Sequence, residues 1–168
     1  MLDQLRGWKP SITNLFPGSA FAAASLNFGP RTISIPHLDF ANLAWGWCAV
    51  TALGNFDPDI GGHIVLDELK LVVRFPPGCT VFIPSALVTH GNTPIGETET
   101  RYSFAQYSAA ALFRWVHNGF KTQASVHGKL GKARQDALKE NAFGDAADRW
   151  AAGLARLSNM SDFVKPSL

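Results

Sequence analysis

The chain has few cysteines, little charge and no long hydrophobic run. Only two of its 168 residues are cysteines, Cys48 and Cys79. This excludes a framework of disulfides, and we expect an intracellular, reducing compartment. Pro, Gly or charged residues interrupt each apolar run before it is long enough to span a membrane. The first residues lack a basic segment followed by an apolar core, so no secretory signal peptide is predicted.

The composition is that of a folded domain. Hydrophobic residues make up 46% of the chain and charged residues 17%, which excludes a disordered polar protein. The length suits one domain with a substantial core. The formal net charge of +2 is compatible with nucleic-acid binding but does not demonstrate it.

Residues 21–116 have the pattern of a β protein. Short runs rich in β-branched and aromatic residues alternate with Gly, Pro, Asn and Asp, which favour turns. About eight evenly spaced strands are typical of a sandwich or jelly roll. The predicted strands are Phe21–Asn27, Arg31–Pro36, Trp45–Leu53, His63–Leu66, Leu71–Phe75, Thr80–Ile83, Val88–His90 and Tyr102–Trp115.

The pattern changes at both ends of this β region. Residues 1–20 contain Pro10 and Pro17-Gly18 and are expected to be irregular. Apolar residues at helical spacing predict one helix over 124–141 and a second after Asp145. We therefore expect an irregular segment (1–20), a β core (21–120) and a helical extension (121–168) whose helices pack on the outside of the same domain.

Three residues with metal-binding side chains stand out within the β region. His37 and Asp39 are two apart, so on a strand their side chains point to the same face. His90 follows much later, and a double-stranded β-helix (jelly roll) would bring it to the same mouth. Two imidazoles and one carboxylate form the facial triad that holds non-haem Fe(II) and leaves coordination positions open. Taken singly, a His-x-Asp is more often an exposed surface pair than a metal site. A lone histidine is more often a buried structural residue than a metal ligand.

A third element follows these residues and makes a metal site the favoured interpretation. Arg101 and Ser103 alternate on one predicted strand and therefore share a face. A guanidinium fork and a hydroxyl are well suited to hold a dicarboxylate cosubstrate. A cupin with another metal is the competing interpretation, but it would be expected to be richer in histidine and would not need Arg-x-Ser.

In this order, His37-Leu38-Asp39, His90 and Arg101-Tyr102-Ser103 resemble the HxD…H…RxS pattern of the Fe(II)- and 2-oxoglutarate-dependent dioxygenases. A narrower resemblance links residues 16–120 to the TET/JBP branch, the oxidases of 5-methylpyrimidines in DNA, and in particular to its fungal, transposon-associated members. The stretches that carry it include Phe28-Gly-Pro-Arg-Thr32, His37-Leu-Asp-Phe-Ala-Asn42, Gly46-Trp-Cys-Ala-Val-Thr-Ala-Leu-Gly54, Gly61-Gly-His-Ile-Val65 and Phe75-Pro-Pro-Gly78.

The resemblance implies a double-stranded β-helix enzyme whose cofactors are Fe(II), 2-oxoglutarate and O2. The implied reaction oxidises the methyl group of 5-methylcytosine, a step of DNA demethylation. Methylated DNA is then a partner, a membrane is not, and nuclear residence follows. The implied site residues are the catalytic metal ligands His37, Asp39 and His90, the cosubstrate residues Arg101, Ser103 and His63, and the base contacts Asn42 and Tyr107.

One position departs from the pattern of the DNA-oxidising relatives. They carry a base-contacting histidine two residues after the tyrosine, where this chain has Ala109. The same chemistry on RNA, protein or a small molecule is therefore an alternative, as is a non-catalytic jelly-roll binding module. Three of the implied residues also have ordinary structural roles. His63 could bond a turn, Asn42 could form an Asx-turn, and Tyr107 could pack across strands.

Overall fold

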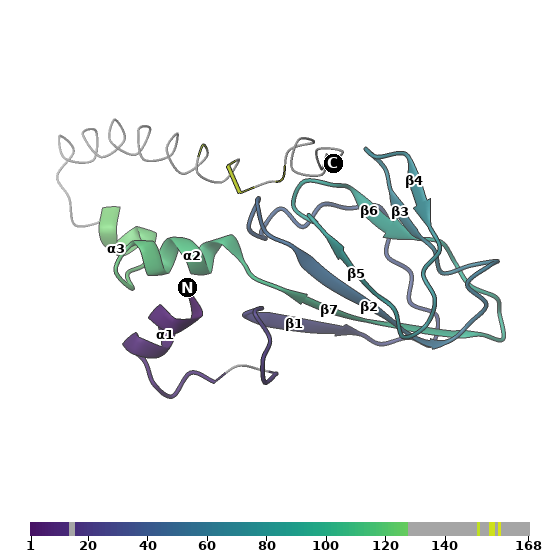
Figure 1. The fold of residues 1–168 in the computed structure, drawn as a ribbon, viewed down its shortest axis with the longest axis horizontal. Coiled ribbons are helices and arrows are strands. Elements are labelled where there is room, and N and C mark those ends of the chain that lie inside the picture. Colours follow the sequence, from purple (N-terminus) through teal and green to yellow (C-terminus); the bar gives the residue numbers. More distant parts are fainter. Residues whose placement is uncertain (14–15, 128–150, 152–154, 157, 159–168) are drawn as a thin grey trace, which may run out of the picture. The chain divides into compact units, whose positions relative to one another are not determined.

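The computed structural model describes residues 1–13, 16–127, 151, 155–156 and 158. The chain divides into two compact units, Met1–Phe120 and Lys121–Leu168. The first unit contains the helices α1 (Leu2–Trp8) and α2 (Ala110–His117) and all the named strands (Figure 1). Helix α3 (Gln123–His127) belongs to the second unit.

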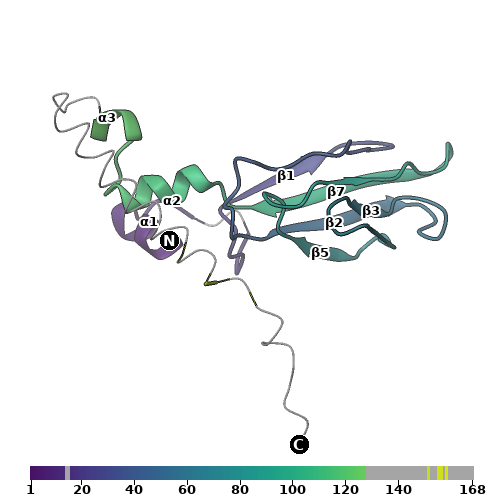
Figure 2. The ribbon, with the colours of Figure 1, turned by 90° about the horizontal axis from the view of Figure 1, so that it is seen from above.

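Within the described part of the chain, seven strands form two antiparallel sheets. The larger sheet has the order β1-β7-β2-β5 and the smaller has the order β4-β3-β6. Figure 2 shows the larger sheet with β1, β7, β2 and β5 side by side. The prediction of a mainly β fold is confirmed. The strands are β1 (Ala23–Asn27), β2 (Cys48–Asn55), β3 (Ile64–Leu66), β4 (Leu71–Val73), β5 (Thr80–Ile83), β6 (His90–Asn92) and β7 (Thr100–Tyr107).

The core lies between the two sheets. Ala52 of β2 and Ile83 of β5 come from the larger sheet, and Ile64 and Leu66 of β3 come from the smaller one. Side chains from both sheets therefore meet in one buried cluster, as in other sheet-on-sheet packings. Full burial of an Ile or Leu side chain contributes about 1.5–3 kcal/mol, so this cluster fixes the distance between the sheets.

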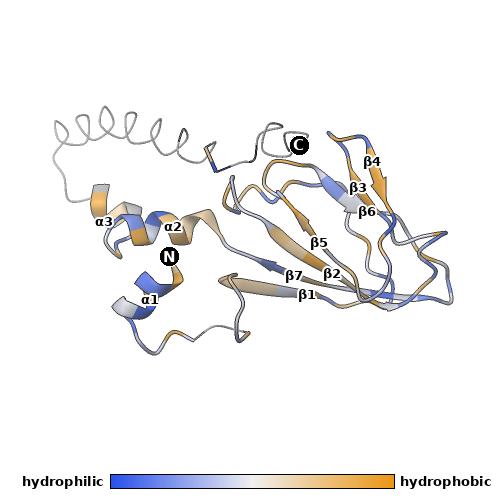
Figure 3. Cartoon of the chain, in the orientation of Figure 1, coloured by the Kyte–Doolittle hydropathy of each residue, from blue (hydrophilic) through white to orange (hydrophobic). Residues whose placement is uncertain are grey.

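Polarity differs between the strands (Figure 3). Strands β2 and β5 are made up mainly of apolar residues. Strand β6, in contrast, consists of His90, Gly91 and Asn92 and is buried throughout. A buried polar strand is destabilising unless its polar groups have partners. The stability of the smaller sheet alone therefore does not explain why β6 carries polar residues.

Gly54 allows β2 and β7 to approach each other closely at the position of Arg101. It has a φ of +114° and is paired in register with Arg101. A Cβ atom at this position would lie 2.3 Å from the carbonyl oxygen of Thr100, so a side chain would push the strands apart. The glycine thus holds the backbone of Arg101 in place.

The N-terminal segment and the end of the last predicted strand differ from expectation. Residues 1–20 contain α1, and Trp8 of α1 meets Trp115 of α2 with ring centroids 4.7 Å apart. The predicted strand Tyr102–Trp115 ends as β7 at Tyr107, and its second half forms α2. The three alanines at 109–111 favour a helix over a strand, and packing against α1 holds the aromatic face of α2.

The predicted strand Arg31–Pro36 is also wrong. Arg31 forms only an isolated bridge with Arg101, and no strand follows it. Ile33 and Ile35 are exposed, so the alternation of apolar residues that suggested a strand does not reflect burial. The backbone N–H of Ser34 instead donates to the side chain of Asn92.

Most of the predicted helical extension lies outside the described residues. Helix α3 includes the first residues of the predicted helix 124–141, and Ala151 is helical. The remainder of that helix and nearly all of the helix after Asp145 fall on residues that are not described. Across the described parts of the chain, no helix is long and apolar enough to cross a membrane.

The two cysteines should react very differently with thiol reagents. Cys48 is buried, and burial followed by the charge of Asp39 raises the pKa of its thiol from 9.0 to about 11. Roughly one Cys48 in a thousand would be a thiolate at pH 8, whereas Cys79 is exposed. We expect one fast equivalent of thiol per chain in the native protein and a second only in denaturant, measured with a chromogenic disulfide. Cys79→Ser should remove the fast phase, and two equally fast thiols would contradict the buried position of Cys48.

Candidate metal centre

The backbone brings the two distant histidines together. The N–H of His37 donates to the carbonyl of His90, and the N–H of His90 donates to the carbonyl of His37, each at 3.0 Å. Two residues on, the N–H of Asp39 donates to the carbonyl of Ser85 at 2.9 Å. His37 and Asp39 lie outside any strand, contrary to the prediction of a strand end, but the bridge holds the segment beside β6.

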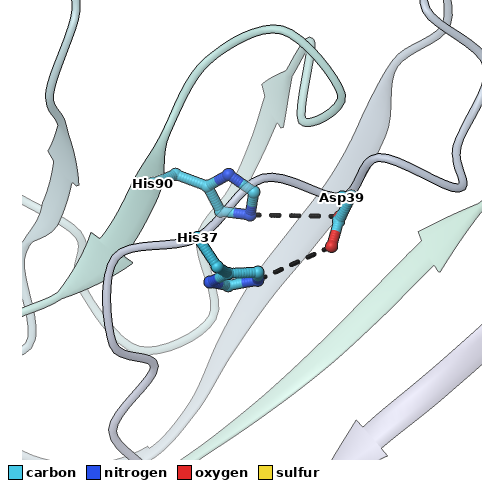
Figure 4. A group of neighbouring side chains, drawn as sticks. All are labelled: His37, Asp39 and His90. Carbon is cyan, nitrogen blue, oxygen red and sulfur yellow. Dashed lines mark ion pairs between the residues drawn. The ribbon is translucent and has the colours of Figure 1, made fainter.

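The side chains of His37, Asp39 and His90 converge on one point (Figure 4). Nε2 of His37 lies 3.5 Å from Oδ1 of Asp39, and Nε2 of His90 lies 3.9 Å from Oδ2 of Asp39. The three donor atoms all lie within 4.8 Å of one another. Both measured separations are shorter than twice a metal–ligand bond of roughly 2.1 Å, so one ion between these atoms can contact the carboxylate and an imidazole together.

The other ring nitrogens fix the orientation of both imidazoles. Nδ1 of His37 lies 2.8 Å from the carbonyl oxygen of Ile35, and Nδ1 of His90 lies 2.9 Å from that of Val88. A carbonyl oxygen only accepts hydrogen bonds, so each Nδ1 carries the proton. Each Nε2 is then left with a lone pair, which is the arrangement of a histidine that binds a metal.

The three residues line a cavity of about 600 Å³. His90 is buried, whereas the side chains of His37 and Asp39 are partly exposed. A metal held here would be reached from solvent on one side and face the interior on the other. Cavities of this size hold small molecules. Arg101, Ser103, Asn42 and Tyr107 line the same cavity.

Arg101 is a buried cation without an acidic partner in the described chain. Its side chain belongs to a residue only 2% exposed, and burial lowers the pKa of the guanidinium. One terminal nitrogen donates to the carbonyl of Thr32 at 3.3 Å, and Nε is buried without a hydrogen-bond partner. The ring of Phe56 lies 6.0 Å from the guanidinium carbon. A buried charge is strongly unfavourable unless paired, so this position favours an anionic ligand.

The polar groups around Arg101 are held by their own contacts. Ser103 is buried, and its hydroxyl accepts a hydrogen bond from Nδ2 of Asn27 at 2.8 Å. Nδ2 of Asn92 donates to the carbonyl of Thr93 at 2.9 Å, and its Oδ1 accepts from the backbone of Ser34 at 2.8 Å. Asn27 and Asn92 were missed in the sequence, since nothing separates a cavity asparagine from a loop asparagine in the sequence alone.

One residue implied by the resemblance, His63, lies elsewhere than the cavity wall, and the departing position 109 lies beside Asn42. His63 does not line the cavity; its Nδ1 lies 3.2 Å from the hydroxyl of Thr93, which also accepts from the backbone N–H of His63. Ala109, where relatives have a histidine, forms an isolated bridge with Asn42. The position of the missing imidazole is therefore next to Asn42 in space.

Comparison of the sequence with protein families finds no match, and comparison with curated proteins finds none either. Among solved structures, the fold is similar to NgTET1 in complex with 5mC DNA, with a TM-score of 0.47 and 18% sequence identity. The similar region covers 54% of this chain and 34% of that chain, so this chain spans about a third of the length of NgTET1.

Removal of one imidazole should abolish metal binding. His90→Ala deletes the buried donor of the cluster, so Fe(II) affinity should fall by more than about 100-fold, beyond the effect expected for an outer-shell partner. The iron stoichiometry of anaerobically loaded protein measures this loss. His117→Ala is the matched control, because His117 is an exposed histidine on α2. Unchanged stoichiometry in His90→Ala would refute the site.

Proposed function

We propose that this protein is an Fe(II)- and 2-oxoglutarate-dependent dioxygenase whose core, residues 21–120, is a double-stranded β-helix. Residues 121–168 are proposed as its helical extension. One observation carries the proposal: the unpaired buried cation of Arg101 lines the same cavity as the cluster His37, Asp39 and His90. A metal and a dicarboxylate then fit one cavity, each with donors of the appropriate chemistry.

His37, Asp39 and His90 are the proposed iron ligands. Two imidazoles and one carboxylate would hold the ion and leave coordination positions open for ligands that are not protein. The iron, when bound, supplies O2 activation and the oxidation of a C–H bond. The chain orients the donors through the two Nδ1–carbonyl contacts and keeps the lone pairs of Nε2 directed at the centre.

Arg101 and Ser103 are the proposed residues for the far carboxylate of 2-oxoglutarate. They alternate on β7 and are both buried in the cavity. A carboxylate would satisfy the free Nε of Arg101 and neutralise its charge, and a charge-assisted contact is strongest away from water. We retain His63 as a cosubstrate residue implied by the resemblance, although Thr93 holds its ring outside the cavity wall.

The proposed substrate is 5-methylcytosine in DNA. Tyr107 supplies an aromatic surface and Asn42 a polar amide within the same cavity as the metal ligands. A base in a duplex reaches such a site only when it is flipped out of the stack, and an aromatic stacker with polar edge contacts would hold it. Contacts to phosphates would make DNA binding weaken as salt rises.

Oxidation of RNA, protein or a small molecule by the same chemistry is the second candidate function. The observation that favours it is Ala109, which brings a methyl group instead of an imidazole beside Asn42. A non-catalytic jelly-roll module is disfavoured, because neither the fixed imidazole tautomers nor the unpaired Arg101 is needed for the fold.

The proposed role of Arg101 predicts opposite effects on ligand binding and on folding. Arg101→Met should weaken 2-oxoglutarate binding by about 100-fold, because truncation of one partner of a buried charge pair costs roughly 3 kcal/mol. Metal affinity should change little. The metal-free protein should unfold at the same or a higher temperature, since an unpaired buried charge has been removed.

Calorimetric titration of 2-oxoglutarate into protein loaded with Mn(II) measures the first effect, and thermal unfolding measures the second. Arg74→Met is the matched control, because Arg74 is exposed and paired with Asp59. An unchanged affinity for 2-oxoglutarate in Arg101→Met would exclude this residue from the cosubstrate site. A large loss of stability with unchanged affinity would make Arg101 a structural residue.

The substrate proposal is tested by nucleoside mass spectrometry. The protein is incubated with Fe(II), 2-oxoglutarate, O2 and duplex DNA that contains 5-methylcytosine. We expect 5-hydroxymethylcytosine to appear and to be absent with His90→Ala. Formation of succinate in step with the product would tie the oxidation to the cosubstrate. Unchanged 5-methylcytosine, with iron and 2-oxoglutarate bound, would reject DNA as substrate and favour the second candidate function.

A further inference from the structure

The side chain of Asn42 holds the carboxylate of Asp39, and the hydroxyl of Ser85 in turn holds the side chain of Asn42. Nδ2 of Asn42 donates to Oδ2 of Asp39 at 3.1 Å and to the hydroxyl of Ser85 at 3.2 Å. The backbone repeats the connection, since the N–H of Asn42 donates to the carbonyl of Asp39 at 2.8 Å and the N–H of Asp39 donates to the carbonyl of Ser85 at 2.9 Å. Asn42 is thus bonded to both the side chain and the backbone of Asp39.

Ser85 anchors this arrangement to the larger sheet. It is only 2% exposed and lies two residues after the end of β5, with its N–H donating to the carbonyl of Ile83 at 2.9 Å. Ser85 does not line the main cavity. A residue at this depth is unable to touch a substrate in that cavity. Its hydroxyl contacts the side chain of Asn42, and its carbonyl accepts from the N–H of Asp39, so these two residues connect it to the metal centre.

We propose that Asn42 and Ser85 are positioning residues that orient the Asp39 carboxylate for metal binding, an inference that rests on the proposed metal site. A carboxylate that rotates freely presents either oxygen. Here the amide of Asn42 engages Oδ2, and Oδ1 faces Nε2 of His37 at 3.5 Å. Outer-shell hydrogen bonds of this kind hold metal ligands in the geometry that binds and typically contribute 10–100-fold to metal affinity.

The same contacts limit what Asn42 can offer a substrate. An ionised carboxylate only accepts hydrogen bonds, so the amide nitrogen must face Asp39 and the orientation of the amide is fixed by its neighbour. Both contacts to Asp39 and Ser85 use that nitrogen. The carbonyl oxygen is what remains for the cavity. Asn42 therefore presents an acceptor, which selects a substrate edge that carries an N–H or O–H donor.

The experiment compares Asn42→Ala, Ser85→Ala and the double variant with the wild-type chain, using Co(II) as a spectroscopic probe of the metal centre. We expect each single variant to bind Co(II) about 10–100-fold more weakly and to shift its visible absorption bands. The double variant should lose less than the sum of the two, because both side chains act on one carboxylate. A role in folding alone would leave the bands of bound Co(II) unchanged.

Asn55→Ala is the matched control, since Asn55 is exposed at the end of β2 and lies outside the cavity lining. Thermal unfolding of each metal-free variant establishes that it is folded. Wild-type affinity and bands in both single variants would overturn the positioning role. A weaker Asn42→Ala with a normal Ser85→Ala would overturn the part assigned to Ser85. Absence of Co(II) and Fe(II) binding by the wild-type chain would instead reject the proposed function itself.

Discussion

The reciprocal hydrogen bonds between the backbones of His37 and His90 are the constraint on which the site depends. They join an irregular segment to the first residue of β6. Both imidazoles therefore extend from backbone positions that lie side by side. The bond from Asp39 to Ser85 fixes the same segment a second time, against a residue shortly after the end of β5. The candidate ligand cluster is therefore hydrogen-bonded to the smaller sheet through His90 and to the segment after β5 of the larger sheet through Ser85.

Arg101 shows how this fold accepts an unfavourable group for the benefit of the site. Three backbone features hold it: the close approach of β2 at Gly54, the ladder of β7 and the bond from its N–H to the carbonyl of Pro30. None of them involves its charge. The backbone thus carries the guanidinium into the interior, where hydrogen bonds within the described chain satisfy only part of it. The carboxylate of the proposed cosubstrate would satisfy the remaining hydrogen-bonding capacity of the guanidinium.

Sequence patterns predicted the parts of this structure that depend on side-chain chemistry. Alternating β-branched residues located the strands of the core, with Thr80–Ile83 matching β5 to the residue. The types and order of His37, Asp39, His90 and Arg101 predicted a shared cavity, and all four line it. These patterns succeed because burial and ligand chemistry restrict which residue types are tolerated at a position.

The same patterns failed where backbone partners decide the conformation. Ile33 and Ile35 alternate as in a strand, yet the segment makes only isolated backbone contacts with β6 and β7 instead of a continuous ladder, and the N–H of Ser34 donates to the Asn92 side chain. The second half of the predicted strand Tyr102–Trp115 forms helix α2 instead, because Trp8 of α1, far away in sequence, packs against Trp115. Neither the absence of a strand at Ile33 and Ile35 nor the packing of α1 against α2 has a local signal in the sequence.

Ser85 illustrates most clearly what the sequence alone does not reveal, since a serine shortly after a strand is typical of a turn. Its position behind Asn42 becomes visible only when the loop carrying Asp39 is laid against the end of β5. Residues that bind a metal directly can be recognised by their type, because few side chains bind metals. The groups that orient those contacts can be almost any polar residue, so only the folded backbone identifies them. In this chain the three candidate ligands are recognisable by residue type, whereas the contacts of Ser85 with Asn42 and Asp39 are visible only in the folded structure.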